Sequence, residues 1–136
     1  MIALIGCVKS KQKRSCKAVD MYISPLFRKS LDYAKKTCSN IYILSAKYGL
    51  LHMDDIISPY NETLNQKTEH EKKIWAAKVH QQMQKEGIST KDKIMFLAGK
   101  NYYKYLKIVY TNSINPLDGL TMGKRLKWLK ESEETT

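Results

Sequence analysis

The amino-acid sequence predicts an α/β fold, a three-layer αβα domain with a short, mainly parallel sheet. Three apolar runs, near residues 2–8, 41–45 and 93–98, each end in small or polar residues and a lysine. Short apolar runs bounded by turn signals are typical of strands buried in a parallel sheet. Segments with helical spacing of apolar residues separate the runs. We therefore expect the three strands to be adjacent or nearly so, with their carboxyl ends at one edge of the sheet.

The first helix is predicted from its capping residues. Ser24 is a favoured N-cap, and Pro25 is favoured at the first position of a helix. The helix should run to about Thr37. Its inner face consists of apolar residues at helical spacing, namely Leu26, Phe27, Leu31 and Ala34. This helix would link the first two strands in a right-handed βαβ unit.

A second helix should follow the capping box formed by Thr68 and Glu71, which stand three residues apart. It should end near Glu86, because the next residue, Gly87, is a helix stop signal. Three large apolar side chains spaced four residues apart mark the buried face of this helix, namely Trp75, Val79 and Met83.

The remaining segments complete the predicted domain. Residues 50–64, which include Pro59, should be mostly irregular. Apolar spacing predicts a helix after the third strand and another near the C-terminus, with inner faces at Tyr102, Leu106 and Val109 and at Met122, Leu126 and Leu129. A short strand is expected near residues 113–114, and residues 131–136 should form a frayed tail. With no repeat or linker in the sequence, we interpret residues 1–136 as one domain.

Composition limits the class of partner. The chain has 136 residues, of which 43% are hydrophobic, and this content excludes wholesale disorder. Its 24 Lys and Arg residues against 13 Asp and Glu residues give a formal net charge of +11. Such an excess favours anionic partners, with nucleic acid first and an acidic membrane surface second. The alternative interpretation is a lysine-rich, soluble surface.

The sequence predicts no cofactor, no metal and no membrane association. The chain contains neither of the nucleotide-binding fingerprints GxxxxGK[ST] and GxGxxG. Cys7, Cys16 and Cys38 show no CxxC spacing, and the histidines show no metal-ligand spacing. This use of cysteine predicts a protein of the reducing cytoplasm. No apolar run approaches the roughly 18 residues that a membrane span needs, and the N-terminal run lacks the features of a signal peptide.

The segments that follow the three predicted strands contain the candidate binding residues. Ligands of open α/β sheets bind beyond the carboxyl ends of the strands. This rule places cationic, hydroxyl and aromatic residues along one rim, namely Cys7, Lys9, Ser10 and Lys11, then Ser45, Lys47 and Tyr48, then Gly99, Lys100 and Tyr102. Such a rim suits a phosphate-bearing ligand. Arg28 and Arg125, on predicted helices, could add guanidinium groups that fork onto phosphate. The alternative is a set of solvated loops and surface charges.

The candidates for catalysis are Ser45, Lys47, Tyr48, Asp54 and Asp118. A Ser–Lys pair can activate a hydroxyl if the lysine is desolvated, or it can aim a hydroxyl and a cation at a phosphate, and we favour the second role. The tyrosine could stack on a base or pack over the end of the sheet. The two aspartates are the candidate acid–base groups. We expect the first three of these residues to line a pocket with Cys7 or Ser10 and with the turn at residues 99–102.

Three motifs resemble those of a widespread bacterial and phage domain family of unassigned function. They are Cys7-x-x-Ser10-Lys11, then Tyr22-x-Ser24-Pro25-Leu26-Phe27-Arg28-Lys29, then Leu44-Ser45-Ala46-Lys47-Tyr48-Gly49-Leu50-Leu51. Further matches are Pro59-Tyr60, Thr63-Leu64, Ala98-Gly99-x-x-Tyr102 and Pro116-Leu117-x-Gly119-Leu120-x-x-Gly123-x-x-Leu126-x-Trp128-Leu129. The resemblance runs over nearly the whole chain.

Two more distant resemblances concern function. The third motif is similar to the Leu-Ser-x-x-Tyr-Gly-Leu-Leu segment of the YaaA (peroxide stress) family, and this similarity implies DNA association. Residues 7–11 and 22–24 show a fainter similarity to the Pro-Cys-Ser and Lys-Pro-Tyr motif of archaeosine synthase, which modifies a deazaguanine base in tRNA. That similarity implies base chemistry.

Two functional hypotheses follow. The first is an enzyme that acts on a nucleotide or a nucleic-acid base by hydrolytic or transferase-like chemistry, for example at the N-glycosidic bond. In this hypothesis the rim lysines hold the phosphate, Ser45 and Tyr48 orient the sugar or base, and Asp54 or Asp118 is the acid–base group. The second hypothesis is a non-enzymatic, basic DNA- or RNA-binding module of the YaaA type, in which net charge drives binding.

Overall fold

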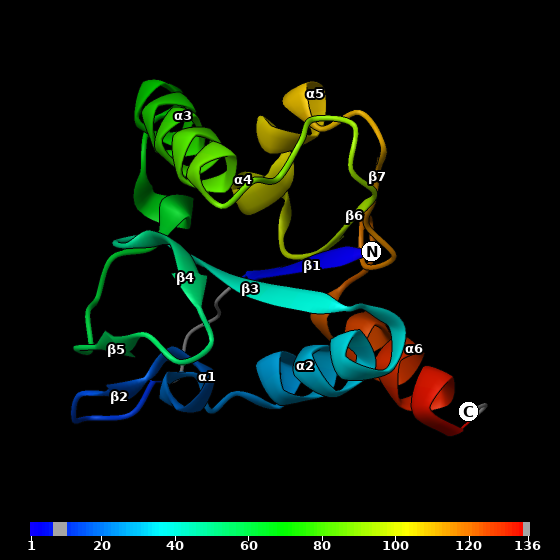
Figure 1. Cartoon of the computed structure of the whole chain (residues 1–136). Coiled ribbons are helices and arrows are strands. Elements are labelled where there is room, and N and C mark those ends of the chain that lie inside the picture. Colours follow the sequence, from blue (N-terminus) through cyan, green and yellow to red (C-terminus); the bar gives the residue numbers. More distant parts are fainter. Residues whose placement is uncertain (7–10, 135–136) are drawn as a thin grey trace.

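The computed structural model describes residues 1–6 and 11–134 and confirms the α/β fold (Figure 1). In the described part of the chain, one sheet has the strand order β4-β3-β1-β6-β7. The bounds are Ile2–Gly6 for β1, Asn40–Ser45 for β3, Gly49–His52 for β4, Ile94–Leu97 for β6 and Ser113–Ile114 for β7. Strands β3, β1, β6 and β7 run parallel, whereas β4 is antiparallel to β3. The sheet is therefore mainly parallel, as predicted.

The three predicted strands are neighbours, with β1 between the other two. Ile2 of β1 lies opposite Asn40 of β3 on one side and opposite Ile94 of β6 on the other. Because these strands run in the same direction, their carboxyl ends lie at one edge of the sheet. The predicted adjacency of the three strands and the common edge of their carboxyl ends are therefore confirmed.

Helices cover both faces of the sheet (Figure 1). On one face lie α2 (Pro25–Thr37) and α6 (Met122–Glu134), which pack on each other. On the other face lie α3 (Glu69–Lys85) and the short helices α4 (Lys100–Tyr103) and α5 (Leu106–Val109). This arrangement is the predicted three-layer αβα architecture.

Helix α2 begins as its capping residues predict. The Ser24 hydroxyl accepts a hydrogen bond from the backbone N–H of Phe27 at 3.2 Å, and Pro25 occupies the first turn. The predicted inner face is buried, namely Leu26, Phe27, Leu31 and Ala34. Tyr33 packs edge-on against Trp128 of α6, with ring centroids 5.0 Å apart. Helix α2 thus joins the sheet to the C-terminal helix.

The capping box at the start of α3 also forms. The Thr68 hydroxyl accepts a hydrogen bond from the Glu71 N–H, and the Glu71 carboxylate accepts one from the Thr68 N–H, each at 3.1 Å. Hydrogen bonding of the Glu71 carboxylate to the backbone of Thr68, and to the Thr68 side chain, lowers the pKa of Glu71. Trp75, Val79 and Met83 are buried, so the predicted inner face of this helix is confirmed.

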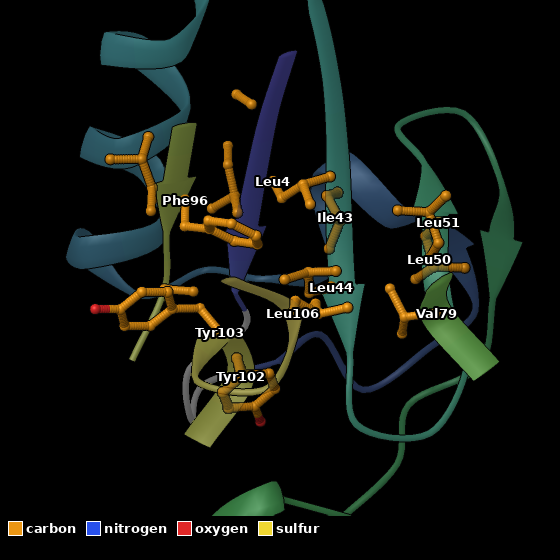
Figure 2. Packing of buried hydrophobic residues seen from close by; sticks show 14 of the residues in the cluster. Leu4, Ile43, Leu44, Leu50, Leu51, Val79, Phe96, Tyr102, Tyr103 and Leu106 are labelled. Carbon is orange, nitrogen blue, oxygen red and sulfur yellow. The ribbon is translucent and has the colours of Figure 1, made fainter. Parts of the chain in front are cut away.

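The core lies between the sheet and both helical layers, and Figure 2 shows part of it. Leu4 and Phe96 occupy paired positions on β1 and β6, so both side chains point to the same face of the sheet. There the Phe96 ring meets Tyr103 of α4, with ring centroids 5.6 Å apart. Leu50 of β4 and Val79 of α3 are buried in the same cluster (Figure 2).

Three expectations about segment limits need correction. Residues 49–52 form the edge strand β4 instead of irregular structure, because Gly49 has a φ of 78° that closes a tight turn back onto β3. Residues 100–109 form two short helices instead of one. Residues 131–134 belong to α6, so the helix continues beyond the point where we expected a frayed tail.

Small elements connect the main ones along the chain. Strand β2 (Cys16–Lys17) pairs antiparallel with β5 (Ile56–Ile57), and a single turn of helix, α1 (Ala18–Met21), follows β2. A 3-10 turn, η1, covers Leu64–Gln66. The chain from β5 to η1 passes along the edge where β1 and β6 end, since residues of the 60–66 segment lie near Gly6 and Leu97.

Candidate functional site

A cavity of about 700 Å³ opens at the carboxyl edge of the sheet, beside the ends of β1 and β6. Parts of α2 and α6 line it, together with residues from the loop and turn at 60–66 and from the β6–α4 connection at 97–102. Ligands of open α/β sheets bind at this edge. The cavity is therefore our candidate functional site.

The lining of the cavity consists of a buried floor and a more exposed rim. The floor is mostly apolar and is formed by Gly6, Leu26, Ser30, Leu97, Ala98 and Leu117. The rim is polar and cationic, with Lys11, Asn61, Glu62, Asn65, Lys100 and Arg125 as half-buried or exposed residues. A ligand with one apolar end and one anionic end would match both parts.

The floor requires a close approach between the end of β1 and the residue after β6. A Cβ atom placed on Gly6 would lie 2.7 Å from the Cβ of Ala98, a distance too short for two carbon atoms. A Cβ atom on Gly99 would instead lie 3.8 Å from Nη1 of Arg125, which is an ordinary contact. Gly6 is therefore needed for packing, whereas Gly99 borders open space next to a cation.

Three basic side chains from separate segments meet at the rim. Lys11 Nζ lies 4.5 Å from the ring centroid of Tyr60, in a cation–π contact. Arg125 donates a hydrogen bond from Nε to the Leu120 carbonyl at 2.9 Å, which orients its guanidinium group. Lys100 is exposed at the start of α4. Within the described residues none of the three forms an ion pair. Their charge therefore favours an anionic ligand.

Amide and carboxylate groups complete the rim. Asn101 donates a hydrogen bond from Nδ2 to Oδ1 of Asn65 at 2.7 Å, and this bond joins α4 to η1. Glu62 is the one carboxylate among the described lining residues. It is exposed, and the nearest cation paired with it is Lys67 at 3.9 Å. The rim thus offers hydrogen-bonding groups for sugar hydroxyls and one carboxylate for proton transfer.

The turn after β3 is built around a buried serine. Ser45 is fully buried, and its hydroxyl accepts hydrogen bonds from the N–H groups of Lys47 at 3.2 Å and Tyr48 at 3.0 Å. The same hydroxyl donates to the Tyr60 hydroxyl at 2.8 Å. The indole N–H of Trp75 donates to the Ser45 carbonyl at 2.9 Å. Ser45 therefore holds the turn and has no surface in the cavity.

Helix α3 and the loop after β5 hold the rest of this turn. Gln82 accepts a hydrogen bond from the Leu50 N–H at 2.8 Å and donates one to the Tyr48 carbonyl at 3.2 Å. The Tyr48 hydroxyl lies 3.3 Å from the backbone of Ser58, and Lys47 is exposed. This segment is not among the described residues that line the cavity, and the polar groups of Ser45 and Tyr48 bond to the protein itself. The catalytic roles predicted for its residues are not tested by this geometry.

Three other candidates lie outside the cavity lining. Arg28 donates a hydrogen bond from Nη1 to the Val19 carbonyl at 2.6 Å. Asp54 occupies an exposed turn before β5, where the nearest lysine is 3.7 Å away. Asp118 is exposed beside Tyr103, and burial together with the hydrogen bond to Asp118 raises the pKa of Tyr103 to about 12. Neither of the two predicted acid–base groups is among the described residues that line the cavity.

The cavity unites five of the predicted binding residues, namely Lys11, Gly99, Lys100, Tyr102 and Arg125. Cys7, Lys9 and Ser10 lie outside the described residues. Sequence reasoning missed other lining residues, namely Ser30, Glu62, Asn65 and Asn101. Two signals could have found some of them. Asn101 lies in the turn segment after the third strand, and Ser30 is a polar residue on the otherwise apolar inner face of a predicted helix.

The rest of the described chain holds two free thiols and no cluster of metal-ligand side chains. There, no three His, Cys, Asp or Glu side chains converge as metal ligands would. None of the described helices has both the length and the apolar character needed to cross a membrane. Cys16 and Cys38 are free thiols, and burial raises the pKa of Cys16.

The chain belongs to a family of unknown function, DUF6884, whose model matches residues 2–131. It is also similar to the uncharacterized protein YfjM of Bacillus subtilis (strain 168). The two are 33% identical over 115 residues, which cover 79% of this chain and 75% of that protein. These matches confirm the predicted membership of a domain family of unassigned function. Neither description names an activity, so the function is argued from the cavity.

Proposed function

We propose that this DUF6884 protein is a nucleotide-processing enzyme whose ligand binds in the cavity at the edge of the sheet. The supporting observation is the meeting of Lys11, Lys100 and Arg125, which form no ion pair with the other described residues, above a buried apolar floor. The three cations belong to segments that are far apart in the sequence. A lining of this kind selects a ligand that is anionic at one end and apolar at the other.

A nucleotide has both halves of this chemistry. Its phosphate can bind two ammonium groups and one guanidinium group, because hydrogen bonds between charged groups and phosphate are stronger than those between neutral groups. Its base suits an apolar floor. The amides of Asn65 and Asn101 can reach sugar hydroxyls at the rim between the two. The cavity volume of about 700 Å³ also falls in the range typical of small-molecule sites.

Glu62 takes the acid–base role in this proposal, in place of Asp54 and Asp118. A carboxylate at the rim can accept a proton from water while the water oxygen attacks C1′ of the ribose. The C1′–N bond breaks in the same displacement as the C1′–O bond forms, and the proton passes from the carboxyl group to the departing base. The products are ribose 5-phosphate and the free base. This reaction is the N-glycosidic hydrolysis considered from the sequence.

Nucleotide binding is tested by isothermal titration with ribonucleoside 5′-monophosphates and with the corresponding nucleosides. We expect the monophosphates to bind more tightly, because only they engage the cationic rim. Lys100→Ala and Arg125→Ala should each weaken monophosphate binding by about tenfold or more, the worth of one charge-assisted hydrogen bond. Lys35→Ala removes an exposed lysine of α2 outside the cavity and is the matched control. Equal binding of nucleosides and monophosphates would contradict the proposal.

Turnover is tested by chromatography of the nucleotide mixture after incubation with the protein. We expect free base and ribose 5-phosphate to accumulate with the wild type. Glu62→Gln should abolish their formation and leave monophosphate affinity within about twofold, because the amide keeps the shape but loses the base. Glu131→Gln, an exposed carboxylate on α6, is the control. An unchanged rate for Glu62→Gln would remove Glu62 from the mechanism.

The formal net charge of +11 supports the alternative of a non-enzymatic nucleic-acid-binding module. Competition separates the two functions. If the cavity is the binding site, a mononucleotide should displace a fluorescent oligonucleotide, and Lys100→Ala should weaken both. Oligonucleotide binding that falls steeply with salt but resists the mononucleotide would favour the alternative.

A further inference from the structure

One polar side chain in the floor of the cavity has no hydrogen-bond partner among the described residues. Ser30 lies on the inner face of α2, is 2% exposed and lines the cavity. No described residue hydrogen-bonds to its hydroxyl, although serines in helices commonly bond back to a carbonyl of the preceding turn. Among the described residues, no side-chain oxygen that is completely closed off lacks a partner. The Ser30 oxygen therefore keeps its small accessible surface, and that surface belongs to the cavity lining.

The surroundings of this hydroxyl are apolar. Leu26 lies one helical turn before Ser30, and the other parts of the floor, near the ends of β1 and β6, are Gly6, Leu97, Ala98 and Leu117. The basic residues that line the cavity belong to its rim and are half-buried or exposed. A phosphate in the floor would lose its hydration without gaining a counter-charge there, which is costly. A neutral base avoids this cost of burying a charge, and its edge can take the one hydrogen bond that the floor offers.

Packing alone does not explain a serine at this position. Alanine has the higher helix propensity, and it would leave no buried hydroxyl without a partner. The free-energy cost of burying the Ser30 hydroxyl without a partner is removed if a bound ligand supplies the missing hydrogen bond. Ser30 is thus a polar group whose partner is absent from the described protein.

We propose that a nucleotide enters the cavity base first and that Ser30 hydrogen-bonds the edge of the base, while Lys100 and Arg125 hold the phosphate at the rim. This inference rests on the proposed function, and it makes Ser30 the residue that recognises the base by a hydrogen bond. A hydroxyl can donate or accept, so Ser30 selects a polar ring edge over an apolar one without choosing one hydrogen-bonding pattern.

The test combines one variant with two kinds of ligand. The first ligand is the ribonucleoside 5′-monophosphate that binds the wild type most tightly. The second is indole riboside 5′-monophosphate, whose ring has the shape of a purine but lacks its hydrogen-bonding groups. We expect Ser30→Ala to weaken the first by roughly tenfold and to leave the second unchanged, because only the first loses a hydrogen bond. The matched control is Ser39→Ala, a change in an exposed serine before β3.

The melting temperature of Ser30→Ala shows whether weaker binding comes from the lost hydrogen bond to the ligand or from a destabilised fold. It should equal or exceed that of the wild type, since the variant removes a buried hydroxyl without a partner. The inference is overturned if Ser30→Ala binds both ligands as the wild type does, or loses both equally. In either case phosphate-dependent binding by the wild type would still support the proposed function. If the wild type binds no monophosphate, the proposed function fails as well.

Discussion

The turns that follow β3 and β6 look alike in the sequence but differ in the fold. Each comes after a buried parallel strand, contains a lysine and lies at the same edge of the sheet. In the turn after β3, the Ser45 hydroxyl, the Tyr48 carbonyl and the Leu50 N–H all bond to the protein. In the turn after β6, Gly99 and Lys100 border an open cavity.

The difference shows that position at the carboxyl edge of a sheet does not suffice to make a site. The β3 turn leads directly into an antiparallel strand, and α3 packs over it, so its polar groups are satisfied internally. The β6 turn leads into a short helix and leaves a gap that α2, α6 and the 60–66 segment surround. We infer that the first turn supports the fold and the second supports binding.

The largest effect should come from Ser45→Ala. The change leaves the N–H groups of Lys47 and Tyr48 and the Tyr60 hydroxyl without the Ser45 oxygen. Loss of partners for partly buried groups should lower the free energy of unfolding by about 2–3 kcal/mol, measured by urea denaturation. At a temperature where the variant is folded, nucleotide affinity should stay within about twofold. A stable variant that no longer binds nucleotide would place Ser45 in the site.

Gly6→Ala should have the next largest effect. The added methyl group would meet Ala98 at 2.7 Å, so β1 or the chain after β6 must move. We expect the free energy of unfolding to fall by about 1–3 kcal/mol in the same denaturation experiment. Gly99→Ala is the matched control, since its methyl group meets Arg125 at an ordinary 3.8 Å, and its stability should change by less than about 0.5 kcal/mol. Equal stability of the two variants would contradict the packing argument.

A smaller, pH-dependent effect is expected at Glu69, which ties α3 to the chain after β6. Hydrogen bonds from Lys104, Tyr105 and Lys72 lower the pKa of Glu69 from 4.5 to about 2. A carboxyl group with a lowered pKa stabilises the fold above its unfolded pKa and loses that effect as the pH falls through the folded one. Glu69→Gln should therefore melt below the wild type at neutral pH, and the difference should shrink as pH falls from about 4.5 to 2.

Thermal melts followed by circular dichroism across this pH range give the measurement. Glu131→Gln serves as the control, because the Glu131 carboxylate is exposed and lies 3.9 Å from Lys127. If the difference in melting temperature between the wild type and Glu69→Gln does not depend on pH, the carboxylate charge does not hold α3 to the chain after β6.

The smallest effect should come from Lys47→Ala. The Lys47 ammonium group is exposed, lies 5.3 Å from the Tyr48 ring centroid and faces no acidic partner among the described residues. We expect stability to change by less than about 0.5 kcal/mol and nucleotide affinity to stay unchanged in titration, in contrast to Lys100→Ala. Loss of binding in Lys47→Ala would restore this segment to the site, as the rule for sheet edges predicts.

Local chemistry explains which parts of the fold were predictable. Ser24 with Pro25, and Thr68 with Glu71, satisfy helix N-termini through bonds between residues three or fewer apart, and both helices begin where these residues predict. Strand β4 was missed because its pairing depends on the turn that Gly49 closes, and its apolar residues are few. For the site, the sequence indicated the sheet edge at which the cavity opens and five of its described lining residues, whereas the catalytic candidates of the β3 turn do not line that cavity.

By itself, the sequence determined the parallel core strands, the start of the two long helices and the cationic character of one sheet edge, because each depends on residues close together in the chain. Only the tertiary structure decided which part of that edge opens into a cavity. Ser30, Glu62 and Arg125 are separated by more than thirty residues each and converge there through the packing of α2 and α6 beside the 60–66 segment. Convergence of that kind leaves no local pattern, since the side chains meet each other only after the helices have packed.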